Sequence, residues 1–238
     1  MELASELQEL KIVLEEACEA MLEGYQESLE SGGKPFILND KNEWLRKAYG
    51  QGEKSADEYW RELEQSPDME FEIPTEARNA LEAAMPAKGL EYRLKHRLAG
   101  VGSLGRPRYT ALGIFESERI ARETKPLLAS AALWVDKKHR DTEIYYEEVL
   151  AGAVRSLDPL VKVYKGWVVR RLAPDCHRIE LSELGPERDE KRMLRAMGWE
   201  TGNIHLGTPS AIKAVRKDLK TRKKPVAVPL LRQRRWRA

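Results

Sequence analysis

The hydrophobic pattern of the first thirty residues has the period of an amphipathic helix. Apolar side chains recur every three or four positions, and glutamates occupy the opposite side. The stripe consists of Leu3, Leu7, Leu10, Leu14, Cys18, Met21 and Tyr25. The pattern predicts one helix over residues 3–30 that ends at the segment "SGGKP". Packing into a helical core and pairing in a coiled-coil dimer are both compatible with such a stripe.

Shorter helical patterns follow in the rest of the chain. They share an apolar period of three to four residues and are bounded by glycine, proline or capping residues. The predicted segments are approximately 43–49, 56–63, 75–84, 141–154, 189–197 and 209–220. Except for 141–154, these helices lie on either side of a middle region with a different pattern.

In that middle region the apolar period changes to two, which is typical of strands. Tyr92, Leu94, His96 and Leu98 alternate with polar residues. The predicted strands cover residues 92–98, 108–115, 119–125, 161–164 and 167–172. Turns at residues 116–118 and 165–166 join the second to the third strand and the fourth to the fifth.

These elements predict an α+β fold with four sections. Residues 1–89 form a helical section, and residues 90–175 form a small antiparallel sheet of about five strands with a glycine-rich loop and one helix, like the N-terminal lobe of a kinase. Residues 176–222 form a connector with a short helical end. Residues 223–238 form a basic tail that we expect to be disordered.

Charge is distributed unevenly, although the net charge of the 238 residues is only +2. Residues 1–90 contain 9 basic and 21 acidic residues, whereas the chain ends in a segment rich in lysine and arginine. The tail is either a solvated end or a weak contact for an acidic partner. Two cysteines are too few for a disulfide framework, and no apolar run is long enough to cross a membrane. We therefore expect a cytoplasmic protein without membrane insertion, and its partners are not identified by the sequence.

A glycine motif between two predicted strands is the first candidate for chemistry. Gly100, Gly102 and Gly105 have the spacing G-x-G-x-x-G. In a dinucleotide-binding fold a helix follows this motif, but here Pro107 and a strand pattern follow. Two interpretations stay open: a loop that covers the phosphates of a nucleotide, and a hairpin whose glycines only allow its turn.

Lys125 favours the first interpretation. It lies 20 residues after Gly105, near the end of the third predicted strand, where kinase-like folds place the lysine that binds the nucleotide phosphates. A glutamate of the next helix normally orients that lysine. The predicted helix 141–154 offers Glu143, Glu147 and Glu148, and we select Glu147 because it lies in the middle of the helix. No catalytic or metal-ligating set is recognisable.

Several longer phrases resemble a bacterial family catalogued as domain of unknown function number 2252. The resemblance covers roughly residues 10–222. It rests on "MLEGYQESLESGGKPFILNDKNEWLRKA", "GVGSLGRPRY", "ARETKPLLASA", "RSLDPLVKV", "WVVRRLAPDCHRIEL" and "AMGWETGNIHLG".

The resemblance implies a kinase-like phosphotransferase with rearranged motifs. On that pattern Gly100, Gly102, Ser103 and Gly105 would cover phosphates, and Lys125 would bind them. Members of the family carry a G-D-x-H-x-x-N segment upstream of the helical region, and the full-length proteins would use ATP and Mg²⁺. This chain contains no Asp-x-His-x-x-Asn, so we expect it to be an internal piece of such a protein.

The sequence therefore predicts the nucleotide-binding portion of a kinase-like protein, inactive alone because the catalytic segment is missing. The alternative is a non-catalytic interaction module whose basic tail binds an acidic partner. Whether Lys125 lies beside the glycine motif distinguishes the two hypotheses.

Overall fold

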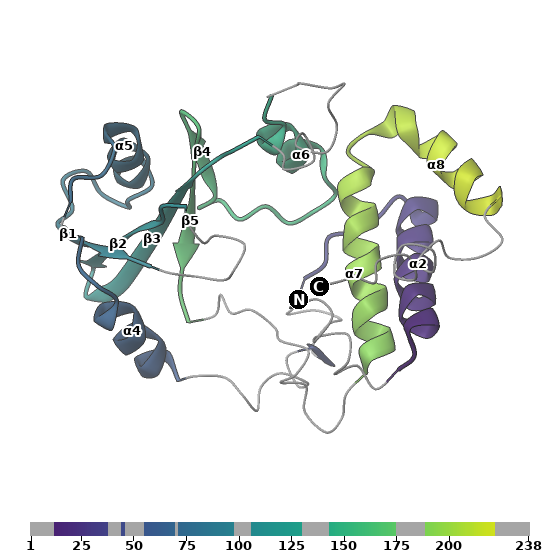
Figure 1. Ribbon diagram of the computed structural model, residues 1–238, viewed down its shortest axis with the longest axis horizontal. Coiled ribbons are helices and arrows are strands. Elements are labelled where there is room, and N and C mark those ends of the chain that lie inside the picture. The colour runs from purple at the N-terminus through teal and green to yellow at the C-terminus, as the bar shows by residue number, and fades with distance from the viewer. Residues whose placement is uncertain are drawn as a thin grey trace, which may run out of the picture. The chain divides into compact units, whose positions relative to one another are not determined.

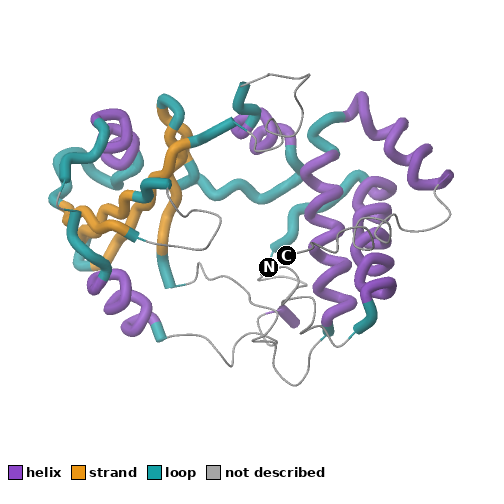
Figure 2. Tube along the Cα trace, in the orientation of Figure 1, coloured by secondary structure: helices purple, strands orange, loops and turns teal. Residues whose placement is uncertain are grey.

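A computed structural model describes residues 12–37, 44–45, 55–69, 71–97, 106–129, 143–174 and 189–221 (Figure 1). Within these residues the chain combines helices with one antiparallel sheet, which confirms the predicted α+β class (Figure 2). None of the described helices is long and apolar enough to span a membrane.

The elements follow one another in the order in which the sequence predicts them. They are α2 (Leu14–Ser31), α4 (Ala56–Gln65), α5 (Thr75–Ala83), β1 (Tyr92–His96), β2 (Tyr109–Phe115), β3 (Glu118–Pro126), α6 (Tyr146–Gly152), β4 (Lys162–Tyr164), β5 (Trp167–Leu172), α7 (Glu190–His205) and α8 (Pro209–Thr221).

These elements separate into two compact units. One unit contains α2, α7, α8 and most of α6, and the other contains the sheet with α4 and α5. The units differ from the linear sections expected from the sequence, because α4 and α5 come from residues 1–89 but belong to the sheet unit. The basic tail lies outside the described residues.

The sheet has the strand order β1-β2-β3-β5-β4, and every neighbouring pair is antiparallel. Two tight turns connect strands within the sheet. Glu116 and Ser117 have φ angles of 48° and 68°, and Lys165 and Gly166 have φ angles of 44° and 81°. Positive φ at both central residues is the conformation whose twist matches that of the flanking strands. The predicted turns therefore join β2 to β3 and β4 to β5.

Helix α5 covers one face of the sheet. Its buried side chains Ala77, Ala80 and Leu81 pack with Ala111 of β2 and Val169 of β5. All five are at most 1 % exposed. The small alanines allow the helix to lie close to the strands, so this face forms the main apolar core of the unit.

Helix α4 packs on the opposite face of the sheet. Its start is fixed by a capping box in which Ser55 and Glu58 bond each other's backbone N–H groups. Leu63 of this helix packs with Leu112, Ala121 and Leu172 of three neighbouring strands. On this face charged residues lie directly beside the α4 contact: Glu123 comes two residues after Ala121 on β3, and Arg170 comes two residues before Leu172 on β5.

The unit that contains α2, α7 and α8 depends on the close contact of α2 with α7. These two helices lie side by side in Figures 1 and 2. Glycines from both helices permit this contact. A Cβ atom on Gly24 would overlap the carbonyl oxygen of Arg195, and a Cβ atom on Gly198 would overlap that of Met21. Towards the C-terminal ends of both helices, the Ser28 hydroxyl donates to Oδ1 of Asn203 at 2.9 Å.

The sequence prediction for α7 was too short. We expected a helix over residues 189–197, but α7 continues to His205. Gly198 and Gly202 lower the intrinsic preference for helix, yet both face α2, where a larger side chain would not fit. His205 therefore ends a helix, where its Nδ1 lies 2.7 Å from the Tyr25 hydroxyl.

The predicted helices 3–30 and 141–154 are only partly described. Helix α2 begins at Leu14, and residues 1–11 lie outside the described part of the chain, as does Asp141. Helix α6 covers Tyr146–Gly152, the middle of its predicted range.

We predict that Gly24→Ala destabilises the protein. Alanine is favoured over glycine in a helix by about 1 kcal/mol. The overlap with the Arg195 carbonyl should outweigh this gain and lower the free energy of unfolding by about 2 kcal/mol. Urea unfolding followed by circular dichroism measures the change. Glu19→Ala, at an exposed position of the same helix, is the control and should change it by less than about 0.5 kcal/mol. Equal or greater stability of Gly24→Ala would contradict the close contact.

Candidate functional site

The glycine motif belongs to the connection between β1 and β2. Gly100, Gly102, Ser103 and Gly105 lie outside the described residues, but the strands on both sides are antiparallel neighbours, with His96 opposite Tyr109. Residues 106–108 are not helical, and β2 begins directly after them. This confirms that the connection joins two antiparallel strands, as predicted, and excludes the strand–loop–helix order of a dinucleotide-binding fold.

Next to this connection lies a buried carboxylate with three arginine partners. Glu123, in the middle of β3, is 1 % exposed. Arg97 Nη1 donates to its Oε2 at 3.0 Å, and Arg108 Nη1 donates to its Oε1 at 2.9 Å. Arg170 of β5 donates to Oε1 through Nη2 at 2.7 Å and through Nε at 3.0 Å. Arg97 and Arg108 stand on the two sides of the glycine motif, so both ends of the connection bond the same carboxylate.

The arginines keep this carboxylate charged. Burial alone would raise the pKa of the Glu123 carboxyl. The charges and hydrogen bonds of Arg170 and Arg97 outweigh burial, and the pKa lies below its ordinary value. Glu123 is therefore an anion in the folded protein at neutral pH.

Lys125 lies two residues further along β3, on the same face as Glu123. Partial burial lowers the pKa of its ammonium group, and the positive charges of Arg108 and Arg170 lower it further, against the opposite effect of Glu123. The sequence placed Lys125 on the third strand, and the structure does so as well. We call Arg97, Arg108, Glu123, Lys125 and Arg170 the Glu123 cluster.

Two buried polar atoms beside the Glu123 carboxylate have no hydrogen-bond partner among the described residues. One is Oγ1 of Thr110, a fully buried residue of β2 that stands directly opposite Glu123 in the register. The other is Nε of Arg108, whose Nη1 bonds Glu123. Most buried polar atoms in proteins are paired, so these two mark the cluster as incomplete.

Glu147, the predicted partner of Lys125, lies on the exposed helix α6. Among the described residues, the carboxylate that influences the pKa of Lys125 is Glu123 and not Glu147. The role of Glu147 stays a prediction. No group of three His, Cys, Asp or Glu residues suited to a metal ion occurs in the described ranges.

Glu123 and its three arginines were not among the site residues predicted from the sequence. One signal was available: in a strand over 119–125, a period of two places Glu123 and Lys125 on one face. The same period places Arg170 and Arg171 on opposite faces of the sheet. The register agrees, since Arg170 pairs with Glu123 and Arg171 with Arg122. The contacts of Arg97 and Arg108 depend on the strand order, which the local pattern does not contain.

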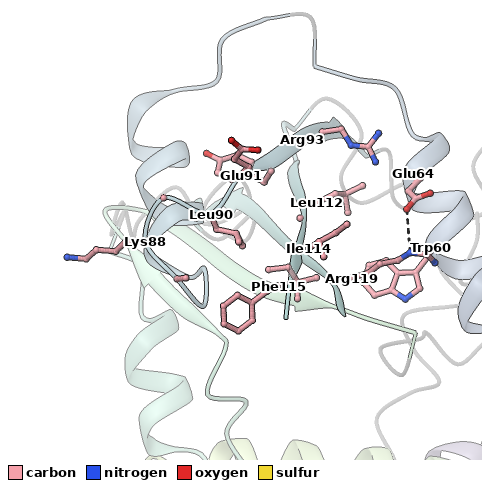
Figure 3. Close-up of a pocket in the computed structure, with 15 residues that line it drawn as sticks. Trp60, Glu64, Lys88, Leu90, Glu91, Arg93, Leu112, Ile114, Phe115 and Arg119 are labelled. Carbon is pink, nitrogen blue, oxygen red and sulfur yellow. Dashed lines mark ion pairs between the residues drawn. The ribbon is translucent and has the colours of Figure 1, made fainter. Parts of the chain in front are cut away.

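A hollow of about 760 Å³ lies at the other end of the strands, near the turn between β2 and β3 (Figure 3). Trp60 of α4 and the strand residues Leu112, Ile114 and Phe115 contribute apolar surface to it. Its charged lining residues have both signs: Lys88, Arg93 and Arg119 with Glu64 and Glu91. Arg119 and Glu64 form an ion pair at 3.7 Å. The hollow therefore lacks the strong positive excess of the Glu123 cluster.

Comparison with protein-family models, curated proteins and solved structures gives no match for this chain. The geometry of the sheet unit is thus the basis for a functional proposal.

We predict that Glu123→Gln destabilises the protein in a pH-dependent way. The change leaves three arginines around a neutral side chain and should lower the free energy of unfolding at pH 7 by about 3 kcal/mol. Because the pKa of Glu123 is lowered by folding, its stabilising effect is present above the ordinary glutamate value of about 4.3 and is lost as the pH falls through the folded pKa. The difference between wild type and variant should therefore shrink below about pH 4.

Urea unfolding of both proteins over a pH series measures this difference. Glu118→Gln, at an exposed position of the same strand, is the matched control and should stay within about 0.5 kcal/mol of wild type. A constant difference between pH 7 and pH 3 would show that the charge of Glu123 is not responsible.

Proposed function

We propose that the sheet unit binds the phosphate groups of a nucleotide at Lys125, as the nucleotide-binding portion of a kinase-like protein. One observation carries the proposal. Lys125 lies among cationic neighbours that outnumber the single buried carboxylate, at the end of the sheet where the glycine-containing connection begins and ends. A positive excess in a partly buried site favours a polyvalent anion.

The order of the elements supports the kinase comparison. In protein kinases a glycine-rich loop joins two strands, the phosphate-binding lysine is on the third strand, and a helix follows. Here the motif lies between β1 and β2, Lys125 is on β3, and α6 is the next described element. We infer that Gly100, Gly102, Ser103 and Gly105 contribute backbone N–H groups to the phosphates, as the resemblance to the family of domain number 2252 implies.

We assign binding, and not phosphoryl transfer, to this chain. Family members carry Asp-x-His-x-x-Asn, which is absent from this sequence. ATP with Mg²⁺ is the nucleotide that the resemblance implies, and membership of that family is part of the proposal. The described residues of the Glu123 cluster supply cations for the phosphates, while their only carboxylate already bonds three arginines.

We predict that Lys125→Ala weakens ATP binding at least tenfold, or about 1.4 kcal/mol, because the ammonium group makes a charge-assisted contact with a phosphate. Isothermal titration calorimetry at low ionic strength gives the dissociation constant, since added salt would screen the interaction.

Lys88→Ala is the matched control for this experiment. Lys88 is an exposed lysine of the same unit, outside the Glu123 cluster, and its removal should change the dissociation constant less than about twofold. Equal binding of ATP by wild type and Lys125→Ala would contradict the proposed function. The absence of binding to wild type at about 10 mM ATP would contradict it as well.

A further inference from the structure

Lys125 is not the only group in the cluster that can bind an anion. Thr110, Glu123 and Arg170 form one row across β2, β3 and β5, since Glu123 is paired with both other residues. Arg108 and Lys125 form the next row on the same face. The pair Tyr109–Thr124 lies between the two rows, and its side chains point to the opposite face. The two rows are adjacent on one face of the sheet.

The first row contains a polar atom that no described residue of the protein satisfies. Thr110 is 0 % exposed, and its Oγ1 has no partner among the described residues. The neighbouring Arg108 has an unpartnered Nε, although its side chain is only 14 % exposed. Leaving a buried donor without an acceptor costs about 1–3 kcal/mol, so an acceptor that enters from outside would recover this cost.

The charges of the cluster show how much negative charge is missing. Four cationic side chains surround one carboxylate, which leaves a formal excess of three positive charges. Lys95, also on this face, is already paired with Asp68 at 2.7 Å and adds nothing to the excess. One phosphate dianion at Lys125 would leave part of the excess uncompensated.

We propose that Thr110, Arg108 and Arg170 form a second phosphate subsite beside Lys125. The ligand then carries two or more linked phosphate groups, one at Lys125 and the next at this subsite. The assignment of the first group rests on the proposed function. A phosphate suits the second position because its oxygens accept several hydrogen bonds at once, and a guanidinium group and a hydroxyl both donate them.

The test compares the binding of orthophosphate and pyrophosphate to wild type by calorimetry at one ionic strength. Pyrophosphate should bind at least about tenfold more tightly, because it alone reaches both positions. Citrate, a polyvalent carboxylate without the linked phosphates, controls for charge alone and should bind no better than orthophosphate.

Two variants separate the subsites. Thr110→Val and Arg170→Gln should each weaken pyrophosphate at least about fivefold and change orthophosphate little, so the ratio of the two affinities falls. Lys125→Ala should weaken both ligands. A ratio near one in wild type, or an unchanged ratio in both variants, would overturn the second subsite.

Thr110→Val also gives a measurement that a purely structural threonine would not. Without ligand its melting temperature should equal or exceed that of wild type, because a buried hydroxyl without a partner is replaced by a methyl group of the same shape. A clear fall in melting temperature would show that the hydroxyl stabilises the fold, and would overturn its assignment to the ligand. Arg170 is half-exposed but bonds Glu123, so Thr110→Val is the safer variant for folding.

The two proposals fail in different ways. If ATP binds through Lys125 but pyrophosphate is no better than orthophosphate, the proposed function stands and the second subsite is wrong. If pyrophosphate shows the expected ratio and variant effects but ATP does not bind, the subsite stands and the nucleotide is the wrong ligand.

Discussion

The charged state of Glu123 is the constraint on which the sheet unit depends. A carboxylate that is 1 % exposed can stay ionised only if cationic groups replace the water that it loses. Arg97, Arg108 and Arg170 do so, and they come from the end of β1, the start of β2 and the middle of β5. One side chain thus links the central strand to three other parts of the sheet. It also fixes both ends of the connection that contains the glycine motif, because Arg97 and Arg108 stand on its two sides.

The position of this cluster follows from how the two helices cover the sheet. Alanines of α5 allow close packing on one face, whereas α4 covers only part of the other face, where Leu63 meets Leu112 and Leu172. Strands β2 and β3 continue past the contact with Leu63 in both directions. At one end they contribute to the hollow near Trp60, which has charges of both signs, and at the other end the sheet presents the arginines and Lys125. Partial coverage of one face therefore creates the candidate site.

The sequence predicted the parts of the fold that local physics determines. The period of two located the strands, and the predicted turn at residues 165–166 has a glycine at one of its two positive φ angles. It did not predict that α7 continues through Gly198, because only contact with α2 explains a glycine there. The partners of Glu123 were missed for a similar reason. They come from residues 26, 15 and 47 positions away, and only the strand order brings them together.

Folding lowers the pKa values of both Glu123 and Lys125, with opposite consequences for their charged forms. Folding lowers the pKa of Glu123, which means that the surrounding arginines stabilise its charged form. Folding also lowers the pKa of Lys125, but for a lysine this means that burial and the same arginines disfavour the charged form. Lys125 adds repulsion with Arg108 and Arg170 that the attraction of Glu123 opposes, and no ion pair of its ammonium group is found among the described residues. The unfavourable charge is explained if an anion from outside completes the cluster, because the repulsion then becomes binding energy.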